Sequence, residues 1–90
     1  MDFGKKVQFP DTVFAQEVDG EIVLLEMGTE HYFGLDSVAT DIWKLLEEGR
    51  TLQETYDALL ELYDVDPVTL KSDLETFVNG LVDSKLATLI

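Results

Sequence analysis

The fold is decided by the stretch VFAQEVDGEIVLLEM, residues 13–27 in a chain of 90 residues. Two runs rich in β-branched and aromatic side chains, 13–18 and 21–27, flank the dipeptide Asp19-Gly20. An Asp-Gly pair between two such runs is typical of a two-residue type I′ turn. The stretch therefore predicts a β-hairpin.

The two faces of this hairpin differ in polarity. Successive side chains of a strand point to opposite faces, and the expected turn places Val18 opposite Glu21. One face then gathers five of the apolar side chains, whereas the other gathers four together with Glu17 and Glu26. We therefore expect the more apolar face to form the core. This face holds Phe14, Val18, Val23, Leu25 and Met27, and the other holds Val13, Ala15, Ile22 and Leu24.

A third strand follows the hairpin. The turn residues 28–30 lead into HYFGL, residues 31–35, which has the composition of a short strand. A three-residue loop puts Phe33 and Leu35 on the core face, whereas a two-residue loop puts Tyr32 there and fills less space. We expect the three-residue loop.

Three helices follow the strands, because from Asp36 onward apolar residues recur at intervals of three and four. The first helix is capped by Asp36 or Ser37. The second begins with a capping box, in which Thr51 and Glu54 each satisfy a free backbone N–H. Asp66 caps the third helix, which carries Pro67 at its first position. The main apolar stripe of the third helix consists of Leu70, Leu74, Phe77 and Leu81.

This order of elements predicts an α+β fold. The domain is winged-helix-like, with an N-terminal three-stranded antiparallel sheet followed by a three-helix bundle. A chain of this length builds one core, so residues 1–90 form a single domain. We expect residues 1–10 to be a flexible N-terminus, and residues 86–90 to end as a short strand or a packed tail.

Composition excludes several classes of function. The chain has no Cys, which removes disulfide scaffolds, thiol nucleophiles and iron–sulfur ligation. Its formal net charge of −13 opposes approach to nucleic acids and to anionic membranes. No apolar run is long enough for a membrane-spanning helix, and the N-terminus does not resemble a signal peptide. We expect a cytoplasmic protein that binds neither nucleic acid nor membrane.

Catalytic and metal sites are also not expected. His31 is the only imidazole, and the sequence lacks a Gly-rich phosphate loop. The carboxylates of Asp64 and Asp66 are explained by a turn and an N-cap, so they do not indicate a metal site. The third helix carries only Lys71 and Lys85 against three acidic residues, which opposes insertion into a DNA groove.

Several short motifs occur in a fixed order between residues 13 and 86. After the Asp-Gly hairpin come an aromatic strand that ends in Leu-Asp, a helix with an Ile-Trp pair, and two short motifs that flank the second helix. These motifs are Tyr32-Phe33-Gly34-Leu35-Asp36, Ile42-Trp43 with Leu45-Leu46, Gly49-Arg50-Thr51 and Tyr63-Asp64-Val65. In this order and spacing the chain resembles the PqqD-like family, which includes the recognition elements of ribosomally made and modified peptides.

The resemblance implies an accessory domain that is not an enzyme and needs no cofactor. Members of the family bind the leader segment of a precursor peptide and present its core segment to a modifying enzyme, commonly a radical SAM protein. The pathway is that of pyrroloquinoline quinone or of another modified peptide, such as a lasso peptide. The leader adds as a strand to the third strand and lies against the third helix. By position, the peptide-binding residues are His31, Tyr32, Phe33, Gly34, Lys71, Leu74, Glu75, Val78 and Val82.

Two alternatives remain open at this point. The runner-up is a winged-helix-type transcription or protein-interaction domain, and an enzyme of unknown class is third. The protein is a monomer or a homodimer, since either the C-terminal tail or a second copy can cover the half-apolar second face of the hairpin.

Overall fold

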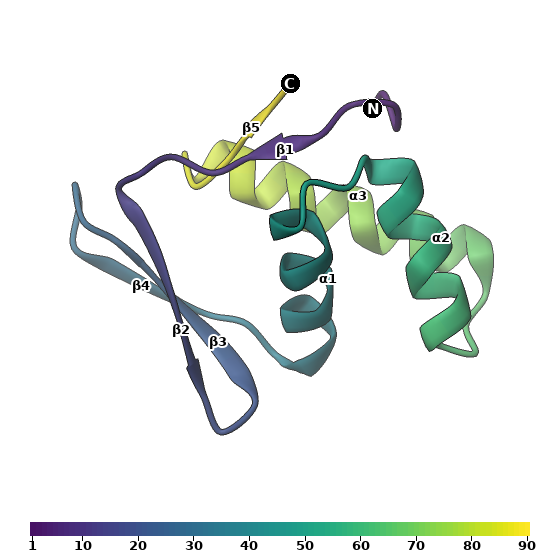
Figure 1. Ribbon diagram of the computed structural model, residues 1–90, viewed down its shortest axis with the longest axis horizontal. Coiled ribbons are helices and arrows are strands. Elements are labelled where there is room, and N and C mark those ends of the chain that lie inside the picture. The colour runs from purple at the N-terminus through teal and green to yellow at the C-terminus, as the bar shows by residue number, and fades with distance from the viewer.

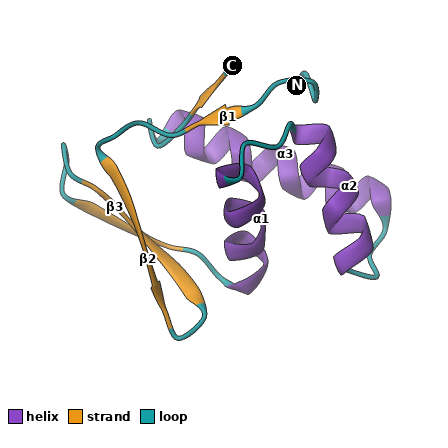
Figure 2. Ribbon diagram, viewed as in Figure 1, coloured by secondary structure: helices purple, strands orange, loops and turns teal.

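The computed structural model describes residues 1–90 as three helices and two small antiparallel sheets (Figure 1). Strands β2, β3 and β4 form a three-stranded sheet in this order, and β1 pairs with β5. Figure 2 shows the larger sheet to one side of the three helices. The predicted α+β, winged-helix-like architecture is confirmed. The elements are β1 (Val7–Gln8), β2 (Val13–Val18), β3 (Glu21–Glu26), β4 (His31–Gly34), α1 (Ser37–Glu47), α2 (Leu52–Leu62), α3 (Pro67–Asp83) and β5 (Thr88–Leu89).

The hairpin between β2 and β3 has the predicted turn and register. Val18 lies opposite Glu21, so the loop consists of Asp19 and Gly20 alone. Both loop residues have positive φ, 53° and 83°. A type I′ turn requires this conformation at both central positions, which explains the Asp-Gly pair.

The prediction for the core face of the hairpin is wrong. Ile22 and Leu24 are the buried residues of β3, whereas Phe14 is 57% exposed. The two acidic residues on the buried side are accommodated at its margins. Glu17 pairs with Lys44 of α1, with 2.6 Å between Oε1 and Nζ, and Glu26 accepts hydrogen bonds from Thr29 in the next turn. Charges at the rim of a face therefore do not prevent its centre from forming the core.

The connection between β3 and β4 also differs from the prediction. Glu26 lies opposite His31, so the loop has four residues, 27–30, instead of three. An even loop puts Phe33 on the face of Leu24, with which it is paired. This is the true core face, so Phe33 is half-buried as expected. The loop is one residue longer than expected, and the buried face is the opposite one. Together these two differences leave Phe33 of β4 on the core side, as predicted.

Thr40 of α1 attaches the sheet to the helices. Its buried Oγ1 accepts a hydrogen bond of 2.9 Å from the backbone N–H of Ile22 and donates one of 3.4 Å to the carbonyl of Leu35. Both groups belong to the backbone around the central strand and the end of β4. The hydroxyl therefore fixes the position of β4 relative to the helices.

We expect Thr40→Val to lower the free energy of unfolding by about 1–3 kcal/mol. Valine has nearly the same shape, but it leaves the buried N–H of Ile22 without an acceptor. Urea denaturation followed by circular dichroism measures the loss. Thr40→Ser keeps the hydroxyl and is the matched control, and an equal loss in both variants would contradict this role of the hydrogen bond.

The helix caps agree with the sequence. Asp36, rather than Ser37, caps α1 by accepting from the N–H of Ala39. Thr51 and Glu54 form the predicted capping box of α2, and its hydrogen bonds hold the pKa of the Glu54 carboxyl below the usual 4.5. Asp66 caps α3, with Pro67 in its first turn.

The N-terminal segment, which we expected to be flexible, is paired with the rest of the chain. Phe3 and Lys5 accept main-chain hydrogen bonds from the start of α2, and Val7 of β1 lies opposite Leu89 of β5. The expectation is corrected for these residues, whose main-chain partners lie far away in the sequence. Of the two endings left open for the C-terminus, the chain adopts the short strand.

The core lies where the helices meet one another and β3. The main stripe of α3 is confirmed for Leu70, Leu74 and Leu81, whereas Phe77 is half-buried at its edge. The largest side chains without appreciable exposure are those of Trp43, Leu24, Leu46, Leu52, Leu59 and Leu74.

Candidate functional site

A groove of about 230 Å³ runs between strand β4 and helix α3. We call it the β4–α3 groove. Its walls are the inner face of the sheet on one side and a flank of the helix on the other. The residues that line it are Leu24, Phe33, Gly34 and Leu35 from the sheet side, Thr76, Phe77, Gly80, Leu81 and Ser84 from the helix side, and Leu86 from the C-terminal segment.

Strand β4 borders this groove with an unpaired edge. The sheet has two edge strands, β2 and β4, and β4 pairs only with β3. Leu35 donates its N–H to Ile22, so the alternation of an antiparallel ladder directs the main chain of Phe33 and His31 toward β3 as well. The N–H and C=O groups of Tyr32 and Gly34 therefore point away from the sheet, where an added strand would pair.

The four strand residues predicted from the sequence all lie on β4, but their side chains do not all point to the same face of the sheet. Phe33 lines the groove, and its ring lies edge-on to that of His31, which is exposed. Tyr32 is 71% exposed on the opposite face of the sheet. Gly34 lines the groove with its main chain, and a Cβ on this residue would meet no atom within 4 Å.

Two of the predicted helix residues have no free surface. Leu74 and Val78 are each 0% exposed, because they face the centre of the core. A docking peptide cannot contact these side chains directly. Substitutions at these two positions would report on folding before they report on binding.

Lys71 and Glu75 lie on the other flank of α3. They line a shallow hollow together with Asn79, and the Lys71 ammonium lies 5.2 Å from the ring centroid of Phe3 in the N-terminal segment. Lys71 and Gly80 are about two and a half helical turns apart, which places them on opposite sides of the helix. The structure therefore does not bring Lys71 and Glu75 to the β4–α3 groove.

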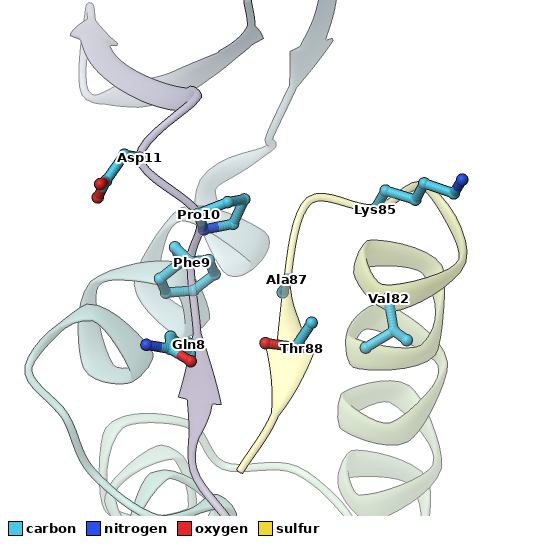
Figure 3. A pocket seen from close by; sticks show the side chains of 8 residues that line it. All are labelled: Gln8, Phe9, Pro10, Asp11, Val82, Lys85, Ala87 and Thr88. Carbon is cyan, nitrogen blue, oxygen red and sulfur yellow. The ribbon is translucent and has the colours of Figure 1, made fainter. Parts of the chain in front are cut away.

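Val82 faces a separate hollow near the C-terminal end of α3. This hollow has about 590 Å³, and β1, β5 and the segment after β1 surround it (Figure 3). Val82 is half-buried there beside Ala87 and Thr88. Although it is the larger hollow, it does not border the free edge of β4.

The helix residues that do line the groove were not assigned to the site from the sequence. The chain carried one signal for them, which is Gly80 in the interior of α3. A helix-interior glycine costs about 0.5–1 kcal/mol relative to alanine. Gly80 does not need a positive φ, and a Cβ at this position would meet no atom within 4 Å. The fold gives no reason for this glycine, whereas close approach of a peptide would.

The chemistry of the groove is that of binding. No charged residue lines it, and its polar side chains are the hydroxyls of Thr76 and Ser84. The groups with clearly shifted pKa values lie elsewhere. An example is the Tyr63 hydroxyl, whose pKa is raised above 10 by its hydrogen bond to Asp41. No cluster of His, Asp and Glu is placed to hold a metal ion, and no helix is long and apolar enough to cross a membrane.

Comparison with solved structures finds two proteins of the same fold. The chain is 41% identical to TbiB1, solved in complex with the TbiA(beta) leader peptide, with a TM-score of 0.85 over 89% of this chain and 93% of TbiB1. It is 20% identical to lasso peptide synthetase B1, complexed with the leader peptide, with a TM-score of 0.85 over 92% and 98% of the two chains. At this identity the second likeness shows the fold alone.

Sequence comparison places the chain in a family. No curated protein sequence matches it. The model of one family, described as coenzyme PQQ synthesis protein D (PqqD), matches residues 21–87, which include the sheet strands β3 and β4 and all three helices. With most of its length matched and with TbiB1 as a close structural relative, the chain belongs to the PqqD family.

Proposed function

We propose that this protein is a recognition element for a ribosomally made precursor peptide and that it binds the leader segment in the β4–α3 groove. The observation that carries the proposal is the free edge of β4 beside an uncharged, largely apolar groove. Membership of the PqqD family and the similarity to TbiB1, which was solved with a leader peptide, support it.

The leader would bind as a fourth strand next to β4. Its main chain would pair with the outward N–H and C=O groups of Tyr32 and Gly34, and each such bond has a net value of about 0.5–1.5 kcal/mol. Every second side chain of an added strand points to the face of Phe33, and therefore into the groove. Main-chain pairing supplies affinity for an extended segment, and the groove supplies selectivity for side chains.

The groove favours a leader with apolar side chains at alternate positions. Phe33, Phe77 and Leu81 offer apolar contacts, while Gly80 leaves room beside them. The net charge of −13 on the protein additionally favours basic residues at the ends of the bound segment, where they remain in solvent. Such charges would mainly raise the association rate.

The protein would act by positioning the peptide, with no chemistry of its own. The groove holds neither a nucleophile–base pair nor a metal-binding cluster, which supports a role in binding, and a separate enzyme would modify or cleave the bound precursor. A radical SAM protein, or the processing enzymes of a lasso-type pathway, would suit this role. DNA binding by α3 is not favoured, because Asp73, Glu75 and Asp83 outnumber its single cation, Lys71.

We expect Tyr32→Pro to weaken leader binding about five- to tenfold. Proline removes the outward N–H and places its ring at the edge, yet an edge strand tolerates it because this N–H has no partner in the sheet. Fluorescence anisotropy measures the affinity, with the TbiA(beta) leader, which TbiB1 binds, as the probe. Tyr32→Thr keeps the N–H and is the matched control. Equal affinity of the two variants would refute strand addition at β4.

A further inference from the structure

Residues 84–87, which we call the α3–β5 turn, build part of the wall of the β4–α3 groove. Leu86 of this turn lines the groove together with Leu81 of α3. The Leu86 N–H donates to the Leu81 carbonyl over 2.8 Å, and the Lys85 N–H donates to the Val82 carbonyl over 3.0 Å. These two bonds form a Schellman motif. The conformation of the turn therefore decides where Leu86 stands in the groove.

The α3–β5 turn is strained at one residue. Lys85 has a φ of 61°, in the left-handed region that a glycine at this position of the motif adopts without cost. The Lys85 side chain is exposed, and it belongs to neither ion pair of the chain. A strained conformation of this kind persists only where the surrounding structure holds it. For the α3–β5 turn, that support comes from the strand that follows.

Strand β5 begins directly after the turn and pairs only with β1 (Figure 1). Ile90 donates its N–H to the carbonyl of Lys6 over 2.9 Å. The alternation of an antiparallel ladder makes Gln8 and Thr88 the next hydrogen-bonded pair. Figure 3 shows the two strands side by side, with Lys85 at the bend that leads from α3 into β5. The N-terminal segment is itself attached to the start of α2, so it can hold β5 in place.

We propose that β1 is a positioning element of the peptide site, which holds β5 and thereby keeps Leu86 in the wall of the β4–α3 groove. Neither residue of β1 lines the groove, so β1 acts through the turn and not by contact with the peptide. Both β1 and β5 also lie outside residues 21–87, which match the family model. The effect of β1 on affinity rests on the proposed function, whereas its effect on Leu86 can be measured without a peptide.

The first test is Gln8→Pro, which acts on the main chain because the Gln8 side chain is exposed. Proline removes the N–H that pairs with Thr88, so binding of the TbiA(beta) leader in fluorescence anisotropy should weaken about fivefold. Gln8→Thr keeps the N–H and is the matched control. Adding Lys85→Gly to Gln8→Pro should restore the affinity to within about twofold of wild type, because glycine holds the turn without strain.

A stabilising substitution away from the turn separates this role from a general effect on stability. Ser72 is exposed on α3 and does not line the groove, and alanine is the better helix former. Ser72→Ala should therefore stabilise Gln8→Pro without restoring its affinity for the leader. Equal rescue by Ser72→Ala and Lys85→Gly would overturn the proposal. Wild-type affinity in Gln8→Pro would overturn it as well.

Hydrogen exchange provides a readout that does not depend on the leader. In Gln8→Pro the amide of Leu86 should exchange about tenfold faster, while the amide of Ile22 on β3 keeps its rate. Coupling is reciprocal, so a bound leader should slow exchange of the Ile90 amide in the wild type. An unchanged Leu86 amide in Gln8→Pro would overturn the role of β1. If Leu86 responds while the wild type binds no leader, the role of β1 stands and the proposed function fails.

Discussion

Gly80→Leu should weaken leader binding about thirtyfold while making the domain more stable. The introduced leucine side chain would enter the open space of the β4–α3 groove, and overfilling a packed site typically costs about 1–3 kcal/mol. Leucine is a better helix former than glycine, so the free energy of unfolding should rise by about 0.5–1 kcal/mol. Anisotropy titration of the leader and urea denaturation measure the two effects. Opposite changes in stability and affinity separate a binding defect from a folding defect.

Asn79→Leu is the matched control for this variant. Asn79 is the neighbouring residue of α3, but it lies on the flank of Lys71 and Glu75, outside the groove. The substitution Asn79→Leu adds the same side chain to the same helix, but on a surface outside the groove. It should therefore leave leader affinity within about twofold of wild type. Weaker binding in Asn79→Leu, with normal binding in Gly80→Leu, would move the peptide to the other flank of α3.

Trp43→Ala should lower the free energy of unfolding by about 3–5 kcal/mol. Trp43 is 2% exposed, its ring centroid lies 4.0 Å from that of Phe9, and its Nε1 donates to Glu47. The substitution would remove the largest core side chain and the ring against which Phe9 of the N-terminal segment packs. The total free energy of unfolding of a small domain is only about 5–15 kcal/mol, so Trp43→Ala would remove much of its stability.

Far-UV circular dichroism during urea denaturation measures this loss without the fluorescence of the single tryptophan. Trp43→Phe keeps an aromatic ring against Phe9 and should cost clearly less than Trp43→Ala. If the alanine variant lost less than about 1 kcal/mol, the N-terminal segment would not be part of the core as the structure has it.

Most elements of the fold could be predicted from local chemistry. The Asp19-Gly20 turn, the capping box of Thr51 and Glu54, and the Asp66 cap each need only neighbouring residues, and all are present. The N-terminal segment could not be predicted, because its partners in α2 and β5 lie far away in the sequence. Short-range patterns carry no information on such pairing.

The prediction of the core face of the sheet was wrong for a reason that concerns function. The choice rested on apolar content, and Phe14, Val18 and Met27 outweighed the face that carries Glu17 and Glu26. In the structure Glu17 pairs with Lys44, a contact that only the folded chain reveals. A face that contradicts the expected pattern while staying exposed is the kind of conflict that functional surfaces produce.

The strand half of the candidate site could be predicted more fully than the helix half. On β4, period-two alternation places Phe33 and Tyr32 on opposite faces whichever face is buried. On α3, the apolar stripe has two flanks, and the sequence alone does not say which flank meets β4. Val82, which widens the apolar stripe on one flank, faces the N-terminal segment. Gly80 lies on the flank that lines the groove.

Hydrogen exchange of the backbone amides, followed by NMR with and without saturating leader, tests strand addition at β4 most directly. The outward N–H groups of Tyr32 and Gly34 should exchange at least about tenfold more slowly in the complex, because they donate hydrogen bonds to the main chain of the leader. Amides of β2 and of the Asp19-Gly20 turn should be unchanged. Protection along β2, with Tyr32 and Gly34 exchanging as in the free protein, would contradict binding in the β4–α3 groove.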